Sequence, residues 1–184
     1  MMKTPVGILT MLLLVSVAGA LCQPKSLELI KDESSVTYRL VHPLHRVEAT
    51  SNDVQYVLDA DVGTKAIKRV SAHVDVTTFN SGNSNRDSHA MEVIDALTYP
   101  DARFTSTSVL QAGDSIYVAG RLTFHGVTRD VRIAGILKWS ENKLVMQGGF
   151  DVSLEAFNIE RPSLLMIPVG DALSFSIVAV FGWH

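Results

Sequence analysis

The sequence predicts an all-β protein in which about eight antiparallel strands close into an extended barrel and one short helix caps an end. Three observations lead to this prediction. Apolar and polar residues alternate with period two over most of the chain, which is typical of strands with one buried and one solvated face. The connections between these stretches are mostly short, and a single stretch has helical spacing instead.

The chain begins with the features of a secretory signal peptide. An apolar run from Val6 to Val17 is followed by Ala18-Gly19-Ala20, which supplies the small residues of a cleavage site. We therefore expect residues 1–20 to be a cleaved signal peptide and residues 21–184 to form one barrel domain. This predicts an exported protein, periplasmic or secreted.

The only cysteine, Cys22, lies close to the expected cleavage site and has no partner for an internal disulfide. A bacterial lipoprotein would bear its lipid anchor on such a cysteine. Leu21 stands where lipoprotein signals have a small residue, so anchoring through Cys22 is the minor alternative.

Charge and hydropathy narrow the class of partner. The formal net charge is −3, without the basic excess that attracts a protein to phosphate backbones, so we expect no nucleic-acid partner. No stretch after the leader approaches the roughly 20 apolar residues of a spanning helix, which predicts no transmembrane segment in the mature chain. The oligomeric state stays open, with a homodimer among the options.

Strict alternation locates the strands. They are expected within residues 36–40, 54–58, 70–76, 104–110, 116–124, 131–139, 143–155 and 173–181. The link His125-Gly126-Val127-Thr128 is short and contains glycine, which predicts a hairpin between the strands on either side of it. Ser140-Glu141-Asn142 is a second tight connection.

Residues 83–97 are the helical exception. Their apolar side chains recur at i, i+3, i+4 and i+7, in Ala90, Val93, Ile94 and Leu97. Ser84 or Asn85 is expected to cap the start, and Pro100 closes the region. A lone amphipathic helix in an all-β chain is expected to lie across one end of the barrel, where its apolar stripe would gate the interior.

The polar cluster Asn85-Arg86-Asp87-Ser88-His89 combines a base, an acid and a hydroxyl at the start of this helix. Neighbouring residues on a helix point in different directions, and no second cluster supplies the missing partners of a catalytic site. We therefore expect no enzyme, and a structural or ligand-head role for Arg86 and Asp87. Asp87 is also favourable near a helix start through the dipole.

The six histidines do not form a recognisable metal motif. His42 and His45 flank Pro43, and turn residues are the simpler interpretation of this pair. His125 is expected to hydrogen-bond its own turn. No metal and no cofactor is predicted.

Several inward aromatic and thioether side chains fit either a ligand cavity or a filled core. They are Phe104, Phe124, Met146, Phe150, Phe157 and Phe175. Three glycines on inward faces, Gly120, Gly135 and Gly148, favour space inside the barrel, or else allow the coiling that closure demands.

Three motifs follow one another along the chain. They are Asn85-Arg86-Asp87 with His89, then Tyr99-Pro100 with Ala102-Arg103-Phe104-Thr105-Ser106, then Gly120-Arg121-Leu122-Thr123-Phe124-His125-Gly126-Val127-Thr128. In order and spacing they resemble the motifs of the YceI-like family, and the similarity covers nearly all of residues 21–184. The resemblance implies a lipocalin-like barrel, usually exported in bacteria, that encloses a polyisoprenoid or another long-chain amphiphilic lipid and has no catalytic residues. The ligand-binding residues we predict on this basis are Phe79, Arg86, Asp87, His89, Phe104, Phe124, Phe150 and Phe157.

The chain departs from the family pattern late in the sequence. Asn158 stands where the family's turn commonly has glycine, and it can supply the same positive φ. The apolar segment Leu164-Leu165-Met166-Ile167-Pro168 is a local difference that could reshape one wall of the cavity. The ligand of better-known members therefore cannot be assumed.

The function predicted is an exported carrier of a long-chain amphiphile. Two alternatives remain: a structural or protein-interaction barrel with a filled core, and, less favoured, a lipid-headgroup hydrolase with His89 or His125 as base. The hydrolase lacks a visible nucleophile.

Overall fold

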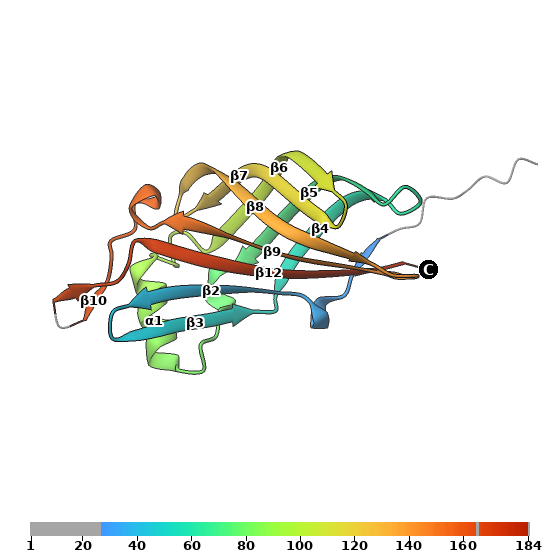
Figure 1. The fold of residues 1–184 in the computed structure, drawn as a ribbon. Coiled ribbons are helices and arrows are strands. Elements are labelled where there is room, and N and C mark those ends of the chain that lie inside the picture. Colours follow the sequence, from blue (N-terminus) through green and yellow to red (C-terminus); the bar gives the residue numbers. More distant parts are fainter. Residues whose placement is uncertain (1–26, 165, 184) are drawn as a thin grey trace, which may run out of the picture.

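The computed structural model describes residues 27–164 and 166–183 (Figure 1). The predicted signal peptide and Cys22 lie outside these residues. Nearly all of the described chain is organised around a single curled antiparallel sheet that forms a half-barrel, consistent with the lipocalin-like class. Among the described residues, no helix has the length and apolar character needed to traverse a membrane.

The strands are β1 (Glu28–Leu29), β2 (Ser35–His42), β3 (His45–Ser51), β4 (Val54–Asp61), β5 (Ala66–Asp75), β6 (Asp101–Ala112), β7 (Ser115–Phe124), β8 (Val127–Trp139), β9 (Lys143–Ser153), β10 (Ser163–Leu164), β11 (Ile167–Pro168) and β12 (Ala172–Gly182). The helical segments are η1 (Lys31–Glu33), η2 (Val76–Thr78), α1 (Ser84–Val93) and η3 (Glu155–Phe157).

The main sheet has ten strands, in the order β3-β2-β12-β9-β8-β7-β6-β5-β4, with β1 paired to β12. Consecutive strands from β4 to β9 are neighbours, and β12 inserts between β9 and β2, so the two ends of the chain meet in one sheet. Strands β10 and β11 form a separate hairpin.

The structure corrects the predicted number of strands in the main sheet from about eight to ten. All eight stretches predicted from alternation are strands, and the structure adds β3 and the two-residue β1. Strand β3 has a weak apolar signal because two of its most buried residues, Ala49 and Ser51, are small or polar. Its inward face therefore does not stand out in the sequence.

The curled sheet leaves a seam between its two edge strands. Among the described residues β3 and β4 are not paired with each other, although only Asn52 and Asp53 separate them. Instead, Thr50 of β3 exchanges two backbone hydrogen bonds of 3.0 Å with Asn80. The side chains of Ser51 and Thr78 add a hydrogen bond of 2.6 Å.

The predicted hairpin between β7 and β8 is confirmed. Its two turn residues, His125 and Gly126, both have positive φ, 47° and 70°. Positive φ at both positions matches the right-handed twist of the flanking strands, which explains why glycine is needed in this link. The link through Ser140-Glu141-Asn142 likewise joins β8 to β9.

The inward glycines allow close contacts between strands, and two of them, Gly135 and Gly148, also line the cavity. Gly135 and Gly148 are directly opposite each other on β8 and β9. A Cβ on Gly135 would lie 2.5 Å from the Gln147 carbonyl oxygen, and one on Gly120 would lie 2.5 Å from that of Thr105. The structure therefore supports close strand contact at all three glycines, and Gly135 and Gly148 border the cavity as well.

Helix α1 caps one end of the barrel, as predicted, but its boundaries differ. Asn83 is the N-cap, and its side chain accepts a hydrogen bond from the backbone N–H of Arg86, so neither Ser84 nor Asn85 has this role. The helix ends at Val93, and Asp95 follows with a φ of 46°. Leu97 therefore leaves the apolar stripe and is 98% exposed.

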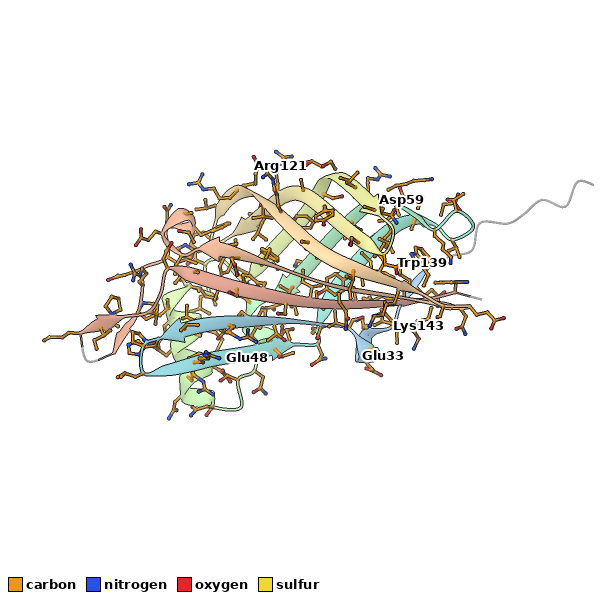
Figure 2. All side chains as sticks on the ribbon, in the orientation of Figure 1. Glu33, Glu48, Asp59, Arg121, Trp139 and Lys143 are labelled. Carbon is orange, nitrogen blue, oxygen red and sulfur yellow. The ribbon has the colours of Figure 1, made fainter. Side chains whose placement is uncertain are left out.

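The two ends of the barrel differ. Figure 1 shows α1, the β2–β3 turn and β10 at the same end of the barrel, the capped end. The opposite end, which we call the far end, contains the β6–β7 and β8–β9 turns. There the rings of Trp139 and Trp183 pack with centroids 5.8 Å apart, and Lys143 bonds Glu33 at 2.8 Å (Figure 2).

Candidate functional site

A cavity of about 390 Å³ occupies the inside of the barrel. Its walls are formed by the inward apolar side chains of the sheet and by the apolar stripe of α1. Representative wall residues are Val36, Leu40, Ala72, Val118, Ile133, Met146, Phe175, Ala90 and Ile94. The alternation that predicts the strands thus also determines which side chains face the cavity.

Four of the predicted aromatic residues line this cavity: Phe79, Phe104, Phe124 and Phe150. The ring of Phe150 stacks on that of Phe175 with centroids 5.0 Å apart, because the two residues are directly opposite on β9 and β12. These rings give the wall large apolar surfaces with little rotational freedom.

Phe157 is not a wall residue. It is fully buried in η3, where its ring packs against Phe124 with centroids 5.7 Å apart. Its carbonyl oxygen is bonded by the Nδ1 atom of His125 at 2.9 Å. His125 therefore ties the β7–β8 turn to η3 instead of bonding its own turn, and its ring also packs on Tyr99.

Arg86 and Asp87 both line the cavity and both hold the loop before α1. The Arg86 guanidinium donates to the side-chain and backbone oxygens of Ser81, each at 2.9 Å. The Asp87 carboxylate accepts the Ser81 backbone N–H at 3.1 and 3.2 Å. These bonds hold the loop at Ser81 against the start of α1 and give both residues a structural role.

Tyr38 is a site residue that the sequence analysis did not single out. Its ring packs on Phe79 with centroids 5.2 Å apart, and it lines the cavity. Burial raises the pKa of its hydroxyl above 10.0, and the Asp87 carboxylate raises it further, while Arg86 acts in the opposite direction. Among the described residues this hydroxyl has no hydrogen-bond partner, so it is a proton donor available to a ligand. The sequence indicates that Tyr38 faces the interior, because it lies between Val36 and Leu40 in the alternating pattern.

The remaining candidates for chemistry do not converge. His89 lines the cavity but its side chain is largely exposed, and its closest acid is Glu92, 3.6 Å away on the same helix. His125 is bonded to Phe157 in a different part of the capped end. In the described ranges, no group of three histidine, cysteine, aspartate or glutamate side chains is arranged to hold a metal ion.

His42 is buried and joins two loops at the capped end. Its Nδ1 accepts the backbone N–H of Leu44 at 3.1 Å, which places the ring proton on Nε2. Nε2 then donates to the carbonyl oxygen of Ile167 at 2.9 Å. His42 is the last residue of β2 and borders the turn at Pro43 and Leu44, so the interpretation of this pair as turn residues is only approximate. The structure adds the link to the β10–β11 hairpin.

The comparisons with known proteins agree with this architecture. The model of the YceI-like domain matches residues 27–181. The chain belongs to the YceI-like family. Protein YceI of Escherichia coli O157:H7 is 25% identical over 169 residues, covering 87% of this chain and 88% of that protein. Protein YceI of Salmonella newport is 24% identical over 168 residues, covering 86% and 88%.

Several solved structures have the same fold. BcnA of Burkholderia cenocepacia superposes with a TM-score of 0.75 at 20% identity, covering 83% of this chain and 99% of its own. The YCEI protein of Campylobacter jejuni gives 0.67 at 18%, covering 78% and 88%. A polyisoprenoid binding domain of Saccharophagus degradans gives 0.60 at 12%, covering 87% and 99%.

Proposed function

We propose that this protein is an exported, non-enzymatic carrier that encloses a long-chain amphiphilic lipid, of the polyisoprenoid class, in its barrel. The observation on which this proposal rests is the distribution of polarity in the cavity. Its walls are mostly apolar and aromatic, and the Arg and Asp that line it, Arg86 and Asp87, both belong to α1 at the capped end. Other polar lining residues are His42, His73, His89, Gln147 and Ser163. An apolar tail would lie along the walls, with its polar head toward α1.

The size of the cavity supports a ligand. A volume of about 390 Å³ falls within the range of roughly 300 to 1,000 Å³ that is usual for small-molecule sites. Each buried methylene contributes about 0.8 kcal/mol, so burial of ten carbons contributes about 8 kcal/mol before the cost of ordering the chain. Tail burial is therefore a large favourable contribution to binding.

The head end has a donor ready for a polar group. The Tyr38 hydroxyl is held in its protonated form and lies near the charges of Arg86 and Asp87. The S. degradans domain of the same fold is described as polyisoprenoid binding, which supports this ligand class. The absence of convergence between His89, His125 and a nucleophile supports a carrier over a hydrolase.

Mass spectrometry tests the carrier. The full-length chain is expressed in a bacterium, recovered from the periplasm without detergent, and analysed intact and after organic extraction. A stoichiometric long-chain isoprenoid or other amphiphile is expected. A ligand-free and thermally stable protein would instead favour the filled-core barrel, and recovery from the cytoplasm would contradict export.

A cavity-filling variant sharpens this test. Ala72 lines the cavity, so Ala72→Phe should displace the ligand while the barrel stays folded. Val57 on β4 points outward, so Val57→Phe is the control and should keep the ligand. If the interior were already filled, Ala72→Phe would cost about 1 to 3 kcal/mol through overpacking and no ligand would be lost.

A further inference from the structure

The capped end exposes apolar side chains at two adjacent hairpin tips. Leu44 in the β2–β3 turn is 61% exposed, and Met166 between β10 and β11 is 97% exposed. Val41 and Ile167, next to them, are also exposed. We define these four residues as the apolar tips.

The two hairpins that bear the apolar tips are hydrogen-bonded to each other. His42 bonds the N–H of Leu44 and the carbonyl oxygen of Ile167, and the N–H of Gly170 bonds the carbonyl oxygen of Val41 at 2.9 Å. The hairpins therefore present their apolar side chains together.

The fold does not need an apolar residue at the β10–β11 tip. Met166 has a φ of 65°, a conformation that a side chain with a Cβ adopts only at a cost and that glycine or asparagine adopts readily. The Met166 side chain is almost fully exposed, so no packing within the folded chain offsets this conformational cost. The exposed side chain requires another explanation.

Residues beside the apolar tips line the cavity. His42 and Val47 from the β2–β3 hairpin line the cavity, as do Ser163 and Val169 beside β10 and β11. Figure 1 shows β10 and the β2–β3 turn at the same end as α1. A surface held against the apolar tips would therefore lie next to the cavity's polar end.

The two segments that bear the apolar tips contain basic residues and are bordered by acidic ones. Residues 41–47 and 161–170 include Arg46 and Arg161 and contain no acidic residue, while Glu48, Glu160 and Asp171 border them directly. Arg161 bonds Glu155 and the carbonyl oxygen of Val169, whereas Arg46 is exposed and forms no ion pair with any other described residue. Apolar tips beside an available cation match the interface of an anionic bilayer, where apolar groups enter the lipid and each basic residue adds attraction.

We propose that the apolar tips insert into an anionic phospholipid bilayer and hold the capped end of the barrel against it. This proposal rests on the carrier function, because a lipid cargo must leave and enter a membrane. A protein surface fits less well, since four side chains bury far less than the roughly 800 Å² per partner of a stable protein interface.

Vesicle flotation tests this proposal. Full-length proteins bearing Cys22→Ser, which removes any acyl anchor, are mixed with vesicles of phosphatidylethanolamine and phosphatidylglycerol. The double variant Leu44→Asp/Met166→Asp should bind these vesicles at least about tenfold more weakly than the parent. Leu110→Asp is the matched control, because Leu110 is 65% exposed at the far end, and it should bind as the parent does.

The charge is tested separately. Arg46→Gln should weaken binding about fivefold on vesicles with phosphatidylglycerol and leave binding to pure phosphatidylcholine vesicles unchanged. Thermal melts of each variant identify any loss of folding.

The outcomes separate this proposal from the carrier function. A double variant that contains extracted lipid but no longer floats supports docking. A parent that contains lipid but does not float overturns docking and leaves the carrier intact, as does a double variant that floats like the parent. A parent dimer that the double variant dissociates, without vesicle binding, would assign the tips to a second copy and also overturn the proposal. Flotation without any extracted lipid would support docking and contradict the carrier.

Discussion

Replacing Gly135 by alanine should destabilise the barrel where β8 and β9 pair with each other. The added Cβ would lie 2.5 Å from the Gln147 carbonyl oxygen and 3.1 Å from the Gly148 Cα. Both are backbone atoms, so no side-chain rotation relieves the contact. The two strands must separate locally, in a stretch where they are joined from Ala134 to Trp139.

The expected cost follows from this geometry. Overpacking typically costs about 1 to 3 kcal/mol, and a contact with backbone belongs at the upper end of that range. Alanine recovers about 0.4 to 1 kcal/mol by restricting the unfolded chain. A net loss of about 2 kcal/mol lowers the Tm of a chain of this size by roughly 4 to 8 °C.

Thermal unfolding followed by circular dichroism measures this loss. Gly170→Ala is the control, because its Cβ would lie at an ordinary 3.4 Å from the Val41 carbonyl oxygen. It should leave the Tm unchanged within about 2 °C. Equal Tm values for Gly135→Ala and Gly170→Ala would refute the interpretation that the inward glycine serves close strand contact.

Four further predictions test single positions. Phe157→Ala should cost about 3 to 5 kcal/mol in urea unfolding yet keep the extracted ligand, since Phe157 is buried beside the cavity and not in its wall; ligand loss in the folded variant would contradict this. Asn158 has a φ of 57°, so Asn158→Gly should be at least neutral and Asn158→Ala should lose about 1 kcal/mol, and the reverse order in urea unfolding would be inconsistent with that conformation. The hydrogen bond from His73 is the main cause that holds the pKa of Asp101 below its ordinary 3.8. The bond therefore stabilises the fold above pH 3.8, and this stability is lost as the pH falls through the lowered pKa. The Tm difference between the parent and Asp101→Asn should accordingly shrink below pH 3.8. Tyr38→Phe should weaken ligand retention by about 0.5 to 1.5 kcal/mol in competition extraction without lowering the Tm, and undiminished retention would exclude a head-group bond.

Much of the barrel is predictable because its inward positions form an unbroken period of two. Ile116, Val118 and Leu122 are each buried as the pattern of β7 predicts. The signal fails where the inward side is small or polar, which is why β3 was missed. It also fails where the backbone departs from regular geometry, since the positive φ of Asp95 ends the helical spacing before Leu97.

The site is less predictable than the fold. Phe104 and Phe157 are both buried aromatics, and only the three-dimensional path of the chain places the first at the cavity and the second behind it. Arg86 and Asp87 were identified, but their contacts with Ser81 depend on a loop conformation that composition does not encode. His42 looked like a turn residue because its acceptor, Ile167, is 125 residues away along the chain.

The seam between β3 and β4 determines where this protein opens. In a sealed cylinder each strand has two hydrogen-bonded neighbours, whereas here β3 and β4 each have one long partner strand. Separating them breaks the Thr50–Asn80 pair and a few side-chain contacts, while separation at any other line breaks a ladder. Local opening follows the least protected contacts, so amide hydrogens of β3 should exchange before those of β8 and β9. We therefore expect the interior to widen along this seam before any other line of the sheet.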